Sequence, residues 1–186
     1  GFDSLMVCAD RGTGKTPAQV QAICHLARER MRAGRGMLRA IVVCPQQARK
    51  NWETEFERFA TVSGKVTVVR GGMVDRVRCL HRAVTTEPDC AFSVAVMSYD
   101  TLVNTIDVVK KIPWDYAVCD ESHKFKSART QRWKDGIEPL RDCSAVRVPM
   151  TGTPIGNTYL DLWTQLEFCG KGLSGFESFE AFRKFH

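Results

Sequence analysis

The chain has 186 residues, a formal net charge of +6 and a sequence pI near 9.0. This length suits one well-filled core and is short for two, so we expect a single domain. The mild basic excess is compatible with a polyanionic partner but does not demand one. No apolar run reaches the roughly 18 residues that span a bilayer and no signal peptide opens the chain, so we expect an intracellular protein without a membrane partner.

Short apolar runs alternate with helical patterns along the chain. The runs expected to be strands cover residues 4–9, 38–44, 65–70, 92–98, 116–119 and 145–150. They are apolar almost throughout, which is typical of strands buried on both faces. Helical patterns cover residues 16–33 and 46–60, and the second repeats Trp52, Phe56 and Phe59 at helical spacing, which we assign to the core. The alternation predicts an α/β fold, a parallel β-sheet flanked by helices on both faces.

The stretch "ADRGTGKT", residues 9–16, follows the first expected strand and opens the first expected helix. This is the context that a phosphate-binding loop requires. Glycines such as Gly12 and Gly14 let backbone N–H groups converge on phosphate oxygens, and the helix N-terminus adds partial positive charge. Lys15 would reach the β and γ phosphates, and Thr16 would bind Mg²⁺.

The stretch "VCDESHKFKS" places two carboxylates, Asp120 and Glu121, at the end of an apolar strand. Adjacent carboxylates repel each other, so a positive partner is expected nearby. The Mg²⁺ of a phosphate-bound nucleotide would supply it, with Asp120 in the metal shell and Glu121 orienting and deprotonating the attacking water. The alternative is that a glycine loop and an acidic strand end arose separately. The required order of strand, loop, helix and later acidic strand end makes this coincidence rare.

Five segments in the expected order resemble the Swi/Snf-like branch of helicase superfamily two. They are "ADRGTGKT" as motif I, "IVVCPQQARKNWETEFERF" as motif Ia, "VMSYDTL", "VCDESHKFKS" as motif II, and "PMTGTPIGNTYLDLW" as motif III. Pro45, Trp52 and Glu55 match that branch, and "TGTP" with Asn157 and Trp163 separates it from RNA-helicase branches. The resemblance implies the first of two RecA-like lobes, a P-loop ATPase fold.

The resemblance also implies roles for individual residues. The nucleotide would be bound by Gly12, Thr13, Gly14, Lys15, Thr16 and His123, and the metal by Thr16 and Asp120. Lys15, Asp120 and Glu121 would act in catalysis, while His123 would link the nucleotide site to Thr151, Gly152 and Thr153. The chain departs from the family pattern at Ser122, where Ala is usual, at the "ADR" opening and at Gly156, where Gln is common. The catalytic carboxylates themselves are intact.

Candidate DNA contacts follow the ends of the expected strands, because ligands of such sheets bind at the carboxyl edge. They are Gln46, Gln47, Arg49, Lys50, Ser98, Tyr99, Lys124 and Lys126. Their contacts would be with backbone phosphates, which suits a motor that tracks double-stranded DNA without reading its sequence. For each of them, a plain surface role is the alternative. The arginine-rich stretch 28–39 ends a helix at the opposite edge, where cations are stabilised by the helix dipole, so we expect a structural role there.

The residues leave three other functions open. The chain could belong to another superfamily-two motor, restriction-type or RNA-directed, or it could bind nucleotide without turnover. A compact phosphotransferase would need a lid and an acceptor pocket, for which no residues are found. We expect a lobe at 1–167, with residues 168–186 beginning a helical insertion or linker towards a second lobe that lies outside this sequence. The fragment would then be a monomer that hydrolyses ATP only with that second lobe.

The eight cysteines lack metal-ligand spacing, and several lie within or beside apolar runs. This pattern predicts reduced, buried thiols.

At the end of the chain, four phenylalanines recur every three residues from Phe176 to Phe185. They predict an apolar stripe that needs a cover.

Overall fold

The computed structural model describes residues 4–10, 12–125, 127–156 and 158–185. Arg11 of the "ADR" opening, the candidate DNA contact Lys126, and Asn157 lie outside the described residues. The strands are β1 (Val7–Cys8), β2 (Leu38–Cys44), β3 (Gly64–Val68), β4 (Phe92–Ser98), β5 (Trp114–Asp120) and β6 (Ser144–Thr151). The α-helices are α1 (Lys15–Arg32), α2 (Arg49–Phe59), α3 (Met73–Val84), α4 (Tyr99–Val109), α5 (Glu138–Asp142), α6 (Trp163–Cys169) and α7 (Phe179–Phe185). Shorter helical turns cover Gln46–Ala48, Ser122–Phe125, Trp133–Ile137 and Tyr159–Leu162.

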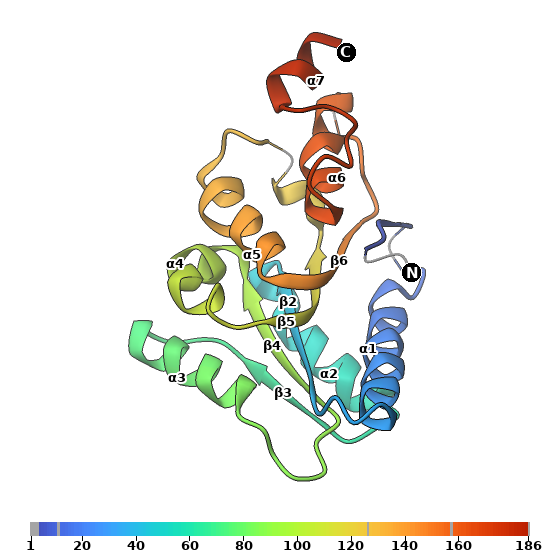
Figure 1. Ribbon diagram of the computed structural model, residues 1–186, viewed down its shortest axis with the longest axis vertical. Coiled ribbons are helices and arrows are strands. Elements are labelled where there is room, and N and C mark those ends of the chain that lie inside the picture. The colour runs from blue at the N-terminus through green and yellow to red at the C-terminus, as the bar shows by residue number, and fades with distance from the viewer. Residues whose placement is uncertain (1–3, 11, 126, 157, 186) are drawn as a thin grey trace.

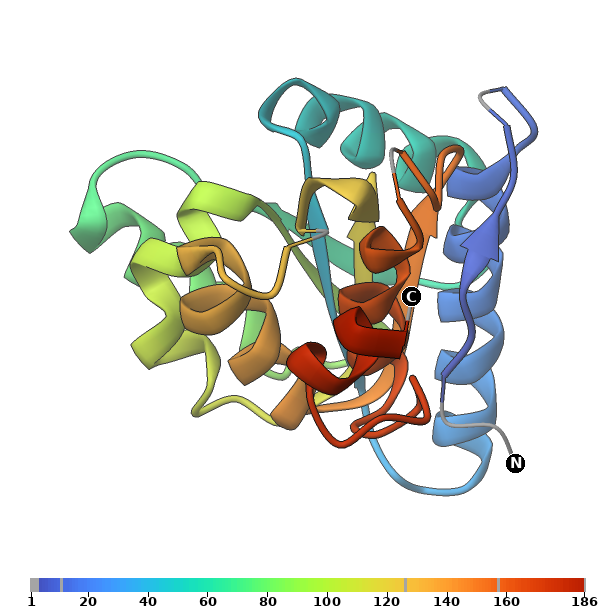
Figure 2. The same ribbon diagram turned by 90° about the horizontal axis from the view of Figure 1, so that it is seen from above.

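The strands of the described residues form one six-stranded sheet in the order β1-β6-β5-β2-β4-β3. Every pairing in it is parallel, as the apolar runs predicted. Figures 1 and 2 show α1 and α2 on one side of this sheet and α3, α4 and α5 on the other. The predicted parallel sheet with helices on both faces is therefore confirmed.

Two apolar clusters fill the spaces between the sheet and its two helix layers. One joins α1 and α2 to the side chains that β2, β4 and β5 direct to that face, and it contains Trp52 and Phe56. The other joins α3, α4, α5 and α6 to the opposite face. Trp52 and Phe56 are buried and Phe59 packs partly buried against the same cluster, so the expected core role of this helix is confirmed.

Strand boundaries agree best in the middle of the sheet. The expected strands 38–44 and 92–98 match β2 and β4 to the residue, whereas the expected strand 4–9 shrinks to Val7–Cys8. This strand lies at the edge of the sheet and pairs only with β6, so fewer ladder hydrogen bonds fix its length. An isolated bridge between Ser4 and Arg147 continues the same alignment.

All eight cysteines are free, and their exposure divides them into three groups. The buried ones are Cys24, Cys44, Cys90, Cys119 and Cys169, the intermediate ones are Cys79 and Cys143, and Cys8 is exposed. The expectation of buried thiols is thus wrong for Cys8, which lies on the edge strand β1.

Among the described residues, no helix combines the length and apolar character needed to cross a membrane.

The carboxyl ends of the strands meet at one edge of the sheet. Cys44 at the end of β2 lies beside Ser98 at the end of β4. Asp120 at the end of β5 lies beside Met150, and Cys8 beside Thr151. The loops that follow these strands carry most of the candidate residues, so the fold gathers them along a single edge.

The arginine-rich stretch lies at the opposite edge. Asp115, near the start of β5, accepts a 2.9 Å ion pair from Arg30 and a 2.8 Å hydrogen bond from the backbone N–H of Arg39. Arg32 pairs with Glu29 at 2.7 Å. These contacts agree with the structural role expected for this stretch.

Candidate active site

Between β1 and α1, two described glycines leave open space beside the backbone. Gly12 and Gly14 adopt left-handed φ angles of 78° and 82°, which side chains rarely tolerate. A Cβ at either position would meet no atom within 4 Å, so the space beside the loop is open. Gly14 is also the N-cap of α1, where backbone N–H groups lack helical partners. The loop therefore fits an anionic phosphate group.

Lys15 folds back over this loop. Its Nζ donates to the carbonyl oxygens of Ala9 at 2.5 Å and Asp10 at 2.6 Å, and the Thr13 hydroxyl donates to Asp10 at 2.7 Å. Both acceptors of Lys15 are neutral carbonyls, and a charged phosphate oxygen is a stronger acceptor for an ammonium group. Thr16 lies in the first turn of α1, where a hydroxyl is close to anything bound on the loop.

The carboxylate of Asp120 is held by two neutral donors. Its Oδ2 accepts from the indole Nε1 of Trp52 at 3.0 Å, and its Oδ1 accepts from the backbone N–H of Glu121 at 3.0 Å. Burial raises the pKa of Asp120, while the Trp52 hydrogen bond and the charge of Lys15 oppose that rise. A divalent cation would supply the positive charge that these neutral donors lack, so the site fits Mg²⁺.

Glu121 stands in an unusual backbone conformation beside Asp120. Its φ is 54°, in the left-handed region that costs a residue with a side chain about 1–3 kcal/mol. Its Oε2 lies 3.2 Å from Nδ1 of His123. A hollow of about 420 Å³ adjoins both carboxylates, and Pro45, Asn51 and Lys124 also line it. Such strain at a carboxylate facing a hollow is typical of a functional position.

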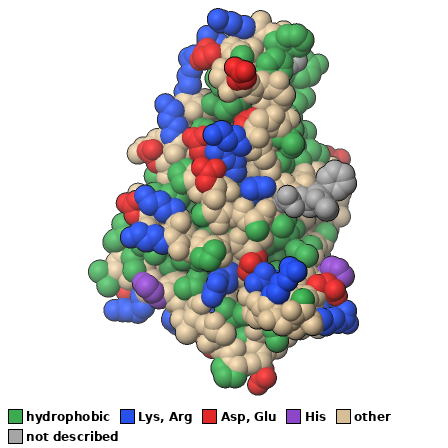
Figure 3. Space-filling model, in the orientation of Figure 1, with side chains coloured by type: hydrophobic (Ala, Val, Ile, Leu, Met, Phe, Trp, Pro, Cys, Tyr) green, Lys and Arg blue, Asp and Glu red, His purple; other side chains and the backbone are tan. Residues whose placement is uncertain are grey.

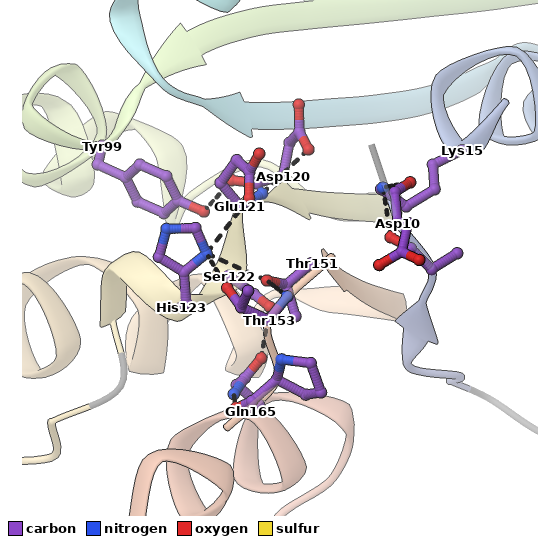
Figure 4. Close-up of polar contacts among 12 residues, drawn as sticks. Asp10, Lys15, Tyr99, Asp120, Glu121, Ser122, His123, Thr151, Thr153 and Gln165 are labelled. Carbon is purple, nitrogen blue, oxygen red and sulfur yellow. Dashed lines mark hydrogen bonds and ion pairs between the residues drawn. The ribbon is translucent and has the colours of Figure 1, made fainter. Parts of the chain in front are cut away.

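His123 connects the carboxylates to the end of β6 and to the loop that follows it. Its Nδ1 lies 3.1 Å from the Thr151 hydroxyl and 3.5 Å from that of Thr153, and the Thr153 N–H donates to Thr151 at 3.0 Å. Figure 4 shows His123, Thr151 and Thr153 on one side of Glu121, with Lys15 on the other side of Asp120. The structure thus brings the expected coupling residues together; Gly152 lies between the two threonines in the same loop.

The expected DNA contacts divide by exposure. Gln46, Gln47, Lys50 and Lys124 are exposed at the carboxyl edge, although Lys50 pairs with Glu53 at 2.9 Å. Arg49 donates to the carbonyl oxygens of Gln46 at 3.1 Å and Val69 at 3.3 Å. These five side chains are placed where the sequence expected them.

Ser98 and Tyr99 are buried, and the expectation that their side chains contact DNA is revised. The Ser98 hydroxyl caps α4 by accepting from the Thr101 N–H at 3.2 Å. The Tyr99 hydroxyl donates to the backbone carbonyl of Asp120 at 2.6 Å, and burial raises the pKa of Tyr99, which keeps it protonated as a donor. Both are at a strand end, as predicted, but the turn into α4 directs them inward.

Sequence reasoning missed three polar contacts of the site. The indole of Trp52, assigned only to the core, also holds Asp120. Gln165 on α6 accepts from the Ser122 hydroxyl at 2.6 Å, and Arg132 donates to the Lys124 carbonyl at 3.1 Å. A buried indole N–H needs an acceptor, and applying that rule to Trp52 would have predicted a polar partner for it. The partners of Gln165 and Arg132 depend on tertiary packing.

Comparison with known proteins gives one matching family model, the SNF2-related domain, which covers residues 2–186. The chain is 33% identical over 182 residues to helicase SWR1 of Saccharomyces cerevisiae, covering 94% of this chain and 11% of that protein. It is 31% identical over 178 residues to the human chromatin-remodeling ATPase INO80, again covering 94% and 11%. The chain therefore spans about a tenth of the length of these relatives.

A solved structure has the same fold. The Sulfolobus solfataricus SWI2/SNF2 ATPase core in complex with dsDNA superposes with a TM-score of 0.75 at 28% sequence identity. The match covers 99% of this chain and 34% of that one.

Proposed function

The chain belongs to the SNF2-related domain family, with the RecA-like fold of a first motor lobe, and from this we propose that it is the ATP-binding and ATP-hydrolysing first lobe of a DNA translocase. The observation that carries the proposal is the meeting of the glycine loop, with Lys15, and the Asp120–Glu121 carboxylates at one edge of the sheet. A pure nucleotide-binding module needs no strained carboxylate to activate water, so the geometry favours turnover.

Each residue of the site has a distinct part in the proposed reaction. The backbone N–H groups around Gly12, Thr13 and Gly14 bind the phosphates, and Lys15 exchanges its loop carbonyls for phosphate oxygens. Thr16 and Asp120 would hold Mg²⁺, which neutralises phosphate charge when bound. Glu121 orients a water molecule and accepts its proton, and His123 holds the Glu121 carboxylate towards Thr151 and Thr153.

The partners follow from the family and the relatives. Because the similar archaeal core was solved with dsDNA, we propose double-stranded DNA as the polymer, contacted through its phosphates by Gln46, Lys50 and Lys124. A second RecA-like lobe would complete the nucleotide site. Residues 1–167 would then form the first lobe and residues 168–186 the start of the connection, in an intracellular protein. The monomeric state of the 1–186 segment stays a prediction.

The test is phosphate release by the complete protein, with and without duplex DNA, for wild type and Glu121→Gln. Glutamine keeps the shape of Glu121 but cannot accept a proton. We expect ATP binding within a few-fold of wild type and turnover lower by about 10²-fold or more. Loss of binding together with turnover would make Glu121 structural instead. Equal phosphate release by the wild type with and without duplex DNA would refute the translocase proposal.

A further inference from the structure

The peptide that joins Asp120 to Glu121 is fixed at both of its polar ends. Its carbonyl oxygen accepts from the Tyr99 hydroxyl at 2.6 Å, and its N–H donates to the Asp120 carboxylate at 3.0 Å. The φ angle of Glu121, which is 54°, is the rotation about its N–Cα bond relative to this peptide plane. Figure 4 shows the Tyr99 ring reaching from α4 towards this peptide. The hydroxyl of Tyr99 therefore helps to hold Glu121 in its strained conformation.

The ring of Tyr99 lies against Arg132, whose side chain is partly exposed at the surface. The guanidinium of Arg132 lies over the Tyr99 ring, 5.5 Å from its centroid. It donates to the carbonyl of Lys124 at 3.1 Å and to Oδ1 of Asp100 at 3.1 Å. Arg132 thus touches the turn that follows Glu121, the helix that carries Tyr99 and the ring of Tyr99 itself.

Two adjoining hollows expose Arg132 to solvent. One, of about 500 Å³, is lined by Asp100, Asn104, Lys124, Gln131 and Arg132. The other, of about 180 Å³, shares Asp100, Lys124 and Arg132 and is bounded by Tyr99 and Gln46. Lys124 also lines the hollow beside Glu121. A ligand that occupies these hollows therefore lies a single side chain away from the Glu121 peptide.

The ion pair of Arg132 with Asp100 is replaceable. The Asp100 side chain is 76% exposed and that of Arg132 is 35% exposed. Exposed pairs of this kind contribute little net stability, because water competes for both partners. A phosphodiester offers two unesterified acceptor oxygens to the N–H groups of an arginine, and Lys124 adds a second cation.

We propose that Arg132 binds a DNA backbone phosphate in these hollows in place of Asp100, and that Tyr99 is a positioning residue that connects this contact to Glu121. The proposal rests on the proposed function, since it explains how bound DNA would act on ATP hydrolysis in the same site. When Arg132 turns to a phosphate, its contacts with the Tyr99 ring and the Lys124 carbonyl change. A shift of the Tyr99 ring then alters the hydrogen bond from its hydroxyl to the Asp120–Glu121 peptide.

The first test compares Tyr99→Phe with Tyr116→Phe in the complete protein. Both changes remove one buried hydroxyl, but Tyr116 donates to Gln19 of α1 at 2.7 Å, away from the carboxylates. We expect Tyr99→Phe to lower DNA-stimulated kcat about tenfold, the typical cost of one buried hydrogen bond. The KM for ATP and the DNA concentration for half-stimulation should stay within about twofold. Equal kcat values for the two variants would overturn the role of Tyr99.

The second test uses surface changes that leave the core intact. Arg132→Gln should raise the DNA concentration for half-stimulation about fivefold. It should also lower the slope of log affinity for DNA against log salt by about one, because one phosphate-binding cation is removed. Asp100→Asn removes the competing anion and should lower that concentration about twofold. Asp107→Asn is the matched control on α4, since Asp107 pairs only with Lys110 among the described contacts.

The double variant Tyr99→Phe with Arg132→Gln decides whether the two residues act together. Arg132→Gln alone should also lower the DNA-stimulated kcat, because it removes a contact with the Tyr99 ring. If the two residues share one connection, the stimulated kcat of the double variant should stay within about twofold of that of Tyr99→Phe alone. Multiplied losses would refute the connection, and an unchanged half-stimulation for Arg132→Gln would refute the phosphate contact. Wild type without DNA stimulation would instead refute the proposed function on which both depend.

Discussion

Ser122 follows the two carboxylates, where the resemblance leads us to expect alanine, and its hydroxyl has a defined partner. Ser122 is fully buried and donates to Oε1 of Gln165 at 2.6 Å. The amide nitrogen of Gln165 in turn donates to the carbonyls of Pro154 and Asp161, each at 2.8 Å. Ser122 therefore provides a hydrogen-bonded connection between the carboxylate segment and the loop after β6, which carries Thr153 and Pro154.

Changing Ser122 to Ala should lower the stability of the fold and also the kcat for ATP hydrolysis. The buried Oε1 of Gln165 would lose its donor, which should lower the free energy of unfolding by about 1–2 kcal/mol. Ser144→Ala is a matched control, because the buried Ser144 hydroxyl donates to Leu140 at 2.7 Å, away from the site. We expect denaturant unfolding to show similar losses for both variants and kcat to fall only for Ser122→Ala. Equal kcat values would limit Ser122 to a structural role.

At the scale of elements, parallel pairing decides which cations share a surface with the nucleotide site. The turn Ser122–Phe125 after β5 carries the exposed Lys124, and the turn after β2 carries Gln46. The end of α1 places its arginines at the opposite edge, where Arg30 pairs with Asp115. Figure 3 shows Lys and Arg side chains interspersed with Asp and Glu on the face it displays, so charge on that face does not single out one basic patch.

Changing Lys124 and Lys126 together to Ala should weaken DNA binding by the complete protein to a similar extent for unrelated sequences. The slope of log affinity against log salt should drop by about two units, because each lysine would neutralise one phosphate. The control variant changes Arg28, Arg32 and Arg35, and it should leave affinity and slope nearly unaltered. A stronger effect of the control would place the DNA on the other edge of the sheet.

At the scale of the molecule, this chain matches about a third of the archaeal ATPase core. In α7, the last described helix, Phe182 is buried, and Phe179 meets the Trp163 ring edge to face with ring centroids 5.5 Å apart. Phe185 is 74% exposed at the end of the same stripe. The helical connection expected over residues 168–186 stays a prediction.

A polypeptide of residues 1–186 alone should fold as a monomer and show no DNA-stimulated ATP hydrolysis. In phosphoryl transfer, an arginine from outside the phosphate loop typically raises the rate about a thousandfold or more, and in this proposal the second lobe provides it. Nucleotide binding should also be weak. Phosphate release is measured with and without duplex DNA, on this polypeptide and on one that includes the second lobe. Strong DNA-dependent turnover by residues 1–186 would point to an arginine within them, with Arg11 the first to change.

Features that depend on local order along the chain were predictable from the sequence alone. Apolar runs predicted β2 and β4 to the residue, since parallel strands buried on both faces are apolar almost throughout. The glycines of the loop and the acidic end of β5 predicted the phosphate and metal positions that we propose, because backbone freedom and carboxylate charge are properties of individual residues.

Which side chains meet across the strand ends depends instead on the tertiary structure. The turn of Ser98 into α4 buries Tyr99 and directs its hydroxyl to Asp120, although the same position at a strand end predicted a DNA contact. The indole of Trp52 reaches Asp120 across 68 residues of sequence, and Ser122 reaches Gln165 across 43. Such contacts depend on the strand order and on the packing of helices against the sheet, and a pattern read along the chain holds no information on either.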